Sequence, residues 1–263
     1  EQMGALSRWE CALATQRHFY QTHVQPFVSK GHKVFVIISD AFRYEIAHEL
    51  MNRVHQEDKF SAALSPMMSS LPSYTQLGMA SLLPHSQIAI NSKDGSAKVD
   101  GQSASGIENR QKILQAGTPV NACAIKLEDF LAMNAKEEGR DLAKSHDVIY
   151  LYHNGIDAIG DKRETEDKLP DAVEDEIKRL LTAMKKVSAV NGSNLLITAD
   201  HGFLYQSTQP GEAEFTAIDK TQFTNISRRF TLADQADESG AMHVFTANQL
   251  NLEGENFFHI PKG

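Results

Sequence analysis

The feature that most constrains the fold is a pair of uninterrupted apolar runs, each of which leads into an aspartate. Residues 33–40 read KVFVIISD, and residues 194–200 read NLLITAD. Neither run shows the polar and apolar alternation of a strand with one solvated face. Both therefore predict strands that are buried on both faces, as in a parallel sheet covered by helices.

Helical and extended segments alternate along the chain. Apolar residues at helical spacing predict helices over 3–29, 43–56, 75–83, 106–116 and 171–190. Short apolar runs predict further strands over 60–64, 119–125, 147–152, 229–232 and 243–246. Two stretches rich in Gly, Ser, Asp and Asn predict long loops or small insertions: 85–105 and 207–227. The alternation is typical of an α/β fold, and we expect three α/β/α layers around a mostly parallel central sheet.

The charge balance limits the kinds of partner. The sequence has 34 acidic and 26 basic residues, a net charge of −8, which argues against a bulk electrostatic clamp on DNA. No apolar run approaches the roughly 20 residues that a membrane span needs, so we expect no membrane partner. Two cysteines, Cys11 and Cys123, make no disulfide framework, and we expect a cytoplasmic protein.

The chain divides into two expected parts. Residues 1–30 are predicted to form a helical lead-in that ends near Gly31, and residues 31–263 are predicted to form the main domain. Because the first residue is Glu1 rather than Met, we also expect the chain to be a fragment of a longer protein.

Acids follow three of the predicted strands. Asp40 and Asp200 end their runs directly, Asp157 follows its strand after a short turn, and His201 comes next to Asp200. In parallel sheets the carboxyl ends of the strands meet at one edge, so we expect these side chains to lie together. Asp and His side chains form a ligand set for Zn²⁺, Mn²⁺ or Mg²⁺. The alternative is that each aspartate caps the helix that follows it.

A hydroxyl-rich segment, Ser69–Thr75, stands just before a predicted helix. A hydroxyl at that place can act as a nucleophile toward phosphate when a metal ion lowers its pKa. The competing interpretation is a Ser or Thr that caps the helix.

In this order, these motifs resemble the alkaline-phosphatase superfamily, and they are most similar to the PglZ proteins of bacteriophage-exclusion (BREX) systems. The resemblance is carried by four stretches: SDAFRYEIA at 39–47, SLPSYTQLGMASLLP at 70–84, YHNGIDAIGD at 152–161 and ITADHGFLYQ at 197–206. It implies an alkaline-phosphatase-like fold for residues 31–263.

The resemblance also implies residue roles. One divalent metal would be surrounded by Asp40, Thr75, Asp200 and His201, with Thr75 as the nucleophile. A second metal would be held by Asp157 and Asp161. The superfamily usually has a histidine at the latter position, and an acid there favours Mg²⁺ or Mn²⁺ over Zn²⁺. The superfamily also uses a further histidine, late in the chain, as a ligand of the second metal. Here only His243 and His259 are candidates. If neither serves, we expect this ligand beyond Gly263.

The implied function is metal-dependent hydrolysis of a phosphate monoester or diester in phage defence, with one or two divalent ions. Nucleic acid would be the first diester to test, and other defence-system proteins would be partners. Two alternatives remain open: a non-catalytic or weakly catalytic scaffold subunit with a residual metal site, and a transferase that uses the same nucleophile.

Other polar residues have both a functional and a structural interpretation. His153 is a ligand or phosphate contact, or a hydrogen-bonded structural histidine. Arg43 contacts phosphate, or forms an ion pair with Glu45 or Glu49. Arg110 follows the loop from Gly101 to Gly106 and is a further candidate to reach the site. Cys123 lies in an apolar run and is most simply a core residue.

Overall fold

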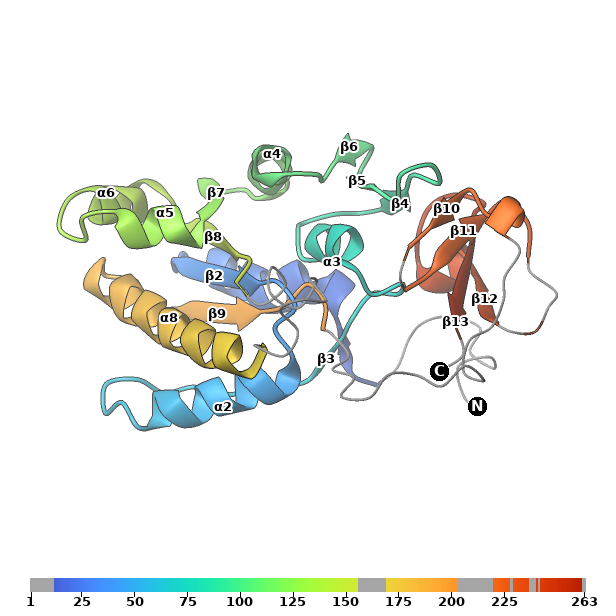
Figure 1. Cartoon of the computed structure of the whole chain (residues 1–263). Coiled ribbons are helices and arrows are strands. Elements are labelled where there is room, and N and C mark those ends of the chain that lie inside the picture. Colours follow the sequence, from blue (N-terminus) through green and yellow to red (C-terminus); the bar gives the residue numbers. More distant parts are fainter. Residues whose placement is uncertain are drawn as a thin grey trace.

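The computed structural model describes residues 12–155, 169–202, 220–227, 229–236, 240 and 242–261 (Figure 1). Its centre is a four-stranded sheet in which all neighbouring strands are parallel. The strands, in spatial order, are β7 (Ala122–Lys126), β8 (Val148–His153), β2 (Val34–Ser39) and β9 (Leu195–Thr198). The predicted α/β class and parallel sheet are confirmed.

The sheet is apolar on both faces. Along β2, Val34, Val36 and Ile38 join one core cluster, whereas Phe35 and Ile37 join the other. All five are completely buried, as the uninterrupted run predicts. The residues of β9 are only half-buried, because within the described residues β9 forms an edge of the sheet. An apolar run alone does not distinguish an edge strand from a central one.

Helices cover the sheet. One core cluster takes apolar residues from α2 (Tyr44–His55), α5 (Leu127–Ala132), α6 (Glu138–Ser145) and α8 (Leu169–Ala189). The other takes residues from α1 (Gln25–Ser29), α3 (Thr75–Ser81) and α4 (Ile107–Gly117). In Figure 1, α3 and α4 lie on the opposite side of the sheet from α2 and α8.

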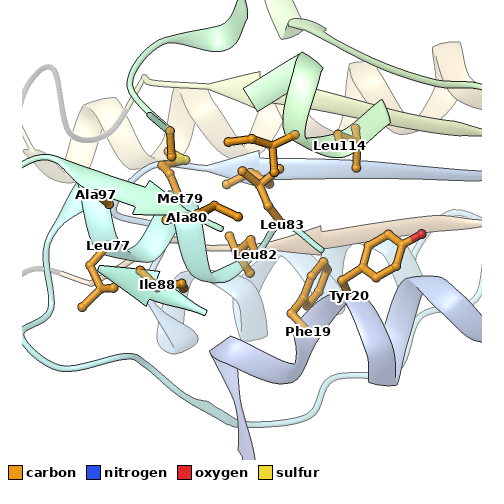
Figure 2. Packing of buried hydrophobic residues seen from close by; sticks show 14 of the residues in the cluster. Phe19, Tyr20, Leu77, Met79, Ala80, Leu82, Leu83, Ile88, Ala97 and Leu114 are labelled. Carbon is orange, nitrogen blue, oxygen red and sulfur yellow. The ribbon is translucent and has the colours of Figure 1, made fainter. Parts of the chain in front are cut away.

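The N-terminal segment packs into the core cluster that contains residues of α3 and α4. It contains β1 (Ala14–Thr15), a 3₁₀ turn η2 (Gln16–His18) and a π-helical turn η3 (Tyr20–Val24) before α1. Figure 2 shows Phe19 and Tyr20 beside Leu82 and Leu83, which follow α3. Of the helix predicted over 3–29, residues 16–29 are helical, whereas residues 12–15 are not and contain β1; residues 1–11 lie outside the described part of the chain.

The strand predicted over 60–64 is wrong. Phe60 and Ala62 pack against the core as an irregular segment. The next strand is β3 (Met67–Met68), which pairs in parallel with β1. A short apolar run becomes a strand only where a partner strand is available, and this depends on distant parts of the chain.

Two small antiparallel sheets complete the described fold. The first lies within residues 85–105, where a long loop or a small insertion was expected, and it contains β4 (Ile88–Ile90), β5 (Ala97–Val99) and β6 (Gln102–Ser103). The C-terminal sheet has the order β10 (Asn225–Ile226), β11 (Thr231–Ala233), β13 (Phe257–Pro261) and β12 (Met242–Thr246), with 3₁₀ turns η6 (Lys220–Gln222) and η7 (Asn248–Leu250). Among the described helices, none has the length and apolar character needed to cross a membrane.

Candidate metal centre

The end of β2 places Asp40 inside the protein. Its backbone N–H donates to the carbonyl oxygen of His153 at 2.8 Å, which extends the pairing of β2 with β8 by one residue. The next residue, Ala41, has a φ of 61°, so the chain turns sharply after Asp40. This turn aims the Ala41 N–H at Asp200 Oδ1, 3.2 Å away. Asp40 is 3% exposed.

Asp200 and His201 follow β9 at the same edge of the sheet. Asp200 Oδ1 accepts a second backbone hydrogen bond, from the His201 N–H at 2.8 Å. Both residues are buried. The ends of β2 and β9 therefore bring together three groups that are separated by up to 161 positions in the sequence (201 − 40).

The three side chains face one another. His201 Nε2 lies 3.1 Å from Asp40 Oδ1 and 3.6 Å from Asp200 Oδ2. One ligand atom from each residue lies within 4.8 Å of the others. The buried atoms Asp40 Oδ1 and Asp200 Oδ2 have no hydrogen-bond donor in the described part of the chain. Buried carboxylate oxygens are rarely left in this state, and a bound cation satisfies them.

The electrostatics of the cluster favour an added positive charge. Burial and the charge of Asp40 raise the pKa of Asp200 to about 8. Burial alone would lower the pKa of His201, but the adjacent carboxylates of Asp40 and Asp200 outweigh burial and raise it. Two acids that are removed from water repel each other when both are ionised. A divalent cation would remove this repulsion.

The histidine ring is oriented as in metal-binding histidines. Its Nδ1 lies 2.7 Å from the Gly202 carbonyl oxygen, which accepts a hydrogen bond only when Nδ1 carries the proton. With the proton on Nδ1, the Nε2 lone pair would face the two carboxylates. Metal-ligating histidines commonly donate their other ring N–H to a backbone carbonyl in this way. The donor set of two carboxylates and one imidazole thus fits a divalent ion.

Thr75 borders this cluster. It is the first residue of α3, and its Oγ1 lies 3.0 Å from His201 Nε2. The N-cap of α3 is Tyr74, and in the described structure no side chain caps this helix. The hydroxyl therefore does not have the capping role that was the main alternative from sequence. Close packing brings α3 here, because a Cβ on Gly78 would overlap the backbone carbonyl of Asp200.

Asp157 and Asp161, the predicted second pair of ligands, lie outside the described residues. The strand that precedes them, β8, ends at His153, which is paired with Ser39 beside Asp40. Neither His243 nor His259 belongs to the ligand cluster found among the described residues. They lie on β12 and β13 of the C-terminal sheet, and His259 packs edge-on against Phe223.

The remaining candidate residues make contacts that stabilise the fold. His153 is buried between Ser39 Oγ at 2.9 Å and Glu176 Oε2 at 2.6 Å. Arg43 forms the predicted ion pair with Glu45, at 2.7 Å. Arg110 is buried, donates to the Ala104 carbonyl and lies over the Tyr152 ring. Cys123 is a buried core residue, as expected.

Two polar residues near the site carry no signal in the sequence. Gln16 Nε2 donates to the carbonyl oxygen of Asp200 at 2.5 Å. Arg229 Nη1 donates to the Ser73 carbonyl at 3.0 Å and lies 3.1 Å from His201 Nδ1. Both come from segments far along the chain from the residues that they contact, and neither follows a predicted strand.

The cluster predicts how metal binding depends on pH. Because the folded-state pKa of Asp200 is raised, the stability that this group contributes is complete below its ordinary pKa near 3.8 and is lost as the pH rises through about 8. Metal binding requires ionised carboxylates, so metal affinity rises over the same range. We expect the melting-temperature gain from Mn²⁺ to increase between pH 6 and pH 8.5. A gain that stays constant or shrinks would contradict this arrangement.

Comparison with known proteins assigns the family. The family described as the BREX system PglZ alkaline phosphatase-like domain matches residues 19–263. Over 258 residues, 97% of this chain and 30% of the relative, the chain is 38% identical to alkaline phosphatase-like protein PglZ of Bacillus cereus (strain H3081.97). Over 274 residues, 100% of this chain and 31% of the relative, it is 37% identical to alkaline phosphatase-like protein BrxZ of Escherichia coli O9:H4 (strain HS).

The chain spans about a third of the length of these curated relatives. The family match runs over nearly all of the described structure, including the central sheet, α3 and the Asp40–Asp200–His201 cluster. The chain therefore belongs to the PglZ family of alkaline phosphatase-like domains of BREX systems.

Proposed function

We propose that this domain is a divalent-metal-dependent hydrolase of phosphate esters that acts in BREX phage defence. The observation that carries the proposal is the 3.0 Å approach of the Thr75 hydroxyl to His201 Nε2, the imidazole atom that faces two buried carboxylates. The proposed scaffold is the three-layer arrangement of an alkaline phosphatase, with the site at the carboxyl edge of the parallel sheet.

Asp40, Asp200 and His201 would hold one ion, with Thr75 beside it, and Asp157 and Asp161 would hold a second. A bound Zn²⁺, Mn²⁺ or Mg²⁺ would lower the pKa of the threonine hydroxyl and offset the charge of the phosphate. The Thr75 oxygen would then attack phosphorus. A new P–O bond would form to Thr75, whose proton would pass to solvent, and the bond to the leaving group would break so that this group departs as an alcohol. Water would later hydrolyse the phospho-enzyme, which restores the hydroxyl and releases phosphate from a monoester or a phosphomonoester from a diester.

The surrounding residues would orient this reaction. The start of α3 is held against Asp200 by the close contact at Gly78, which fixes Thr75 relative to the ligands. Arg229 brings a guanidinium to the loop that precedes Thr75. A guanidinium is a strong partner for a phosphate oxygen, so it supports an anionic substrate.

The family also suggests the setting. Its relatives are named as PglZ and BrxZ proteins, and we propose that other BREX proteins are partners of the longer protein. With a net charge of −8, the chain would need metal ions or partner proteins to approach nucleic acid. A nucleic-acid or nucleotide diester is the substrate to test first.

The direct test compares a phosphodiester and a phosphomonoester. The chain is stripped of metal with a chelator, and Mn²⁺, Mg²⁺ or Zn²⁺ is titrated back with bis(4-nitrophenyl) phosphate or 4-nitrophenyl phosphate as substrate. We expect turnover that is absent after chelation and returns with metal. Metal binding without turnover of either ester would instead favour a scaffold with a residual metal site.

A further inference from the structure

Gln16 is a buried glutamine in the N-terminal segment, and both the nitrogen and the oxygen of its side-chain amide form hydrogen bonds. It is 2% exposed. Its Nε2 donates to the carbonyl oxygens of Ala199 at 2.9 Å and Asp200 at 2.5 Å. Its Oε1 accepts from the backbone N–H of Ser70 at 3.0 Å. One side chain therefore connects the end of β9 with the loop that leads into α3.

Both connected segments carry residues of the candidate centre. The Asp200 carbonyl belongs to the peptide bond that joins the two ligands Asp200 and His201. Ser70 lies five positions before Thr75 (75 − 70), and its hydroxyl lies 2.7 Å from that of Ser81, at the end of α3. A shift of either segment would change the distance between Thr75 and His201.

Gln16 is itself firmly held. The residues before it form β1, in which Ala14 pairs with Met67 and Thr15 with Met68. The next residue, Arg17, donates to the Asn251 carbonyl at 3.0 Å. Phe19 follows within the buried core (Figure 2). A side chain fixed on both sides can impose its geometry on the groups that it contacts.

We propose that Gln16 is a positioning residue that fixes the Asp200–His201 backbone relative to the segment carrying Thr75. Its importance to catalysis rests on the proposed function. The chemistry explains the residue type, because an uncharged amide supplies two donors and one acceptor where two carbonyls and one N–H converge. The family match begins at residue 19, so Gln16 lies outside it.

The test removes the amide and preserves the size of the side chain. Gln16→Met has nearly the same length but makes none of the three hydrogen bonds. Hydrogen exchange is measured on peptides that cover 69–75 and 195–202, and Mn²⁺ affinity is measured by calorimetry. Val24→Ala, a cavity variant in the same segment whose parent side chain is fully buried, controls for general destabilisation. Gln25→Ala, at an exposed glutamine, controls for loss of an amide.

We expect faster exchange in both peptides and at least tenfold weaker Mn²⁺ binding for Gln16→Met, with neither change in the controls. If Gln16→Met does not fold, Gln16→Asn serves, because it keeps an uncharged amide but is one methylene too short to contact both segments at once. Unchanged exchange, or the same change in Val24→Ala, would overturn the proposal. If the unmodified chain binds no Mn²⁺, the proposed function fails, whereas the exchange data still decide whether Gln16 fixes these segments.

Discussion

Replacement of Thr75 by alanine is expected to reduce phosphoester hydrolysis by roughly three orders of magnitude or more, because the attacking oxygen is removed. The fold should survive, since Thr75 does not cap α3 and the variant loses one hydroxyl contact, which is worth about 1 kcal/mol or less. Turnover of the phosphodiester, the melting temperature and Mn²⁺ affinity should be measured on the same preparation. Activity should fall while the other two stay near their original values.

Two further variants assign the nucleophile. Thr75→Ser keeps the hydroxyl and should retain part of the activity. Ser73→Ala should have a mild effect, because the contact that Ser73 makes with Arg229 uses its backbone carbonyl, which the variant keeps. If Ser73→Ala abolishes turnover and Thr75→Ala does not, then Thr75 is not the nucleophile, even though the family assignment stands.

The central part of this arrangement can be predicted from the sequence because its signals are local. The apolar runs of β2 and β9 identify parallel strands, and such strands present their last residues at one edge of a sheet. That rule places Asp40 beside Asp200 and His201 without any knowledge of distances. The position of Thr75 is predicted by the motif around it, whereas the 3.0 Å contact with His201 depends on how α3 packs.

The parts that the sequence does not predict depend on long-range pairing. Gln16 reaches Asp200 across 184 positions, and Arg229 reaches Ser73 across 156. Neither has a neighbour in the sequence that signals a site. The segment 60–64 has apolar residues but no partner strand in the part of the chain that the structure describes, and the polar stretch 85–105 forms strands because β4, β5 and β6 pair with one another. In each case the outcome is decided by tertiary contacts.

Asp200→Asn is expected to abolish Mn²⁺ binding at the centre and yet to stabilise the metal-free protein near pH 8.5. Asp200 Oδ1 accepts hydrogen bonds from the backbone N–H groups of Ala41 and His201. The amide of the variant keeps an oxygen that can accept both. Its new N–H₂ replaces Oδ2 and can donate to Asp40 Oδ1, which lacks a donor within the described residues. The substitution also removes a carboxyl whose pKa is raised by burial and by Asp40, and whose ionisation costs stability.

Melting curves with and without Mn²⁺ at pH 8.5 separate the two effects. The original protein should gain about 2.7 kcal/mol of stability when the metal concentration is one hundred times its dissociation constant, and Asp200→Asn should gain nothing. Asp141→Asn, at an acid whose side chain is 76% exposed, is the control and should behave like the original protein in both conditions. If the cluster served only to stabilise the fold, the change in melting temperature would have the opposite sign. The metal-free Asp200→Asn variant would then melt at a lower temperature than the original protein. A higher melting temperature combined with lost metal binding is the result expected of a site in which stability is sacrificed to hold an ion.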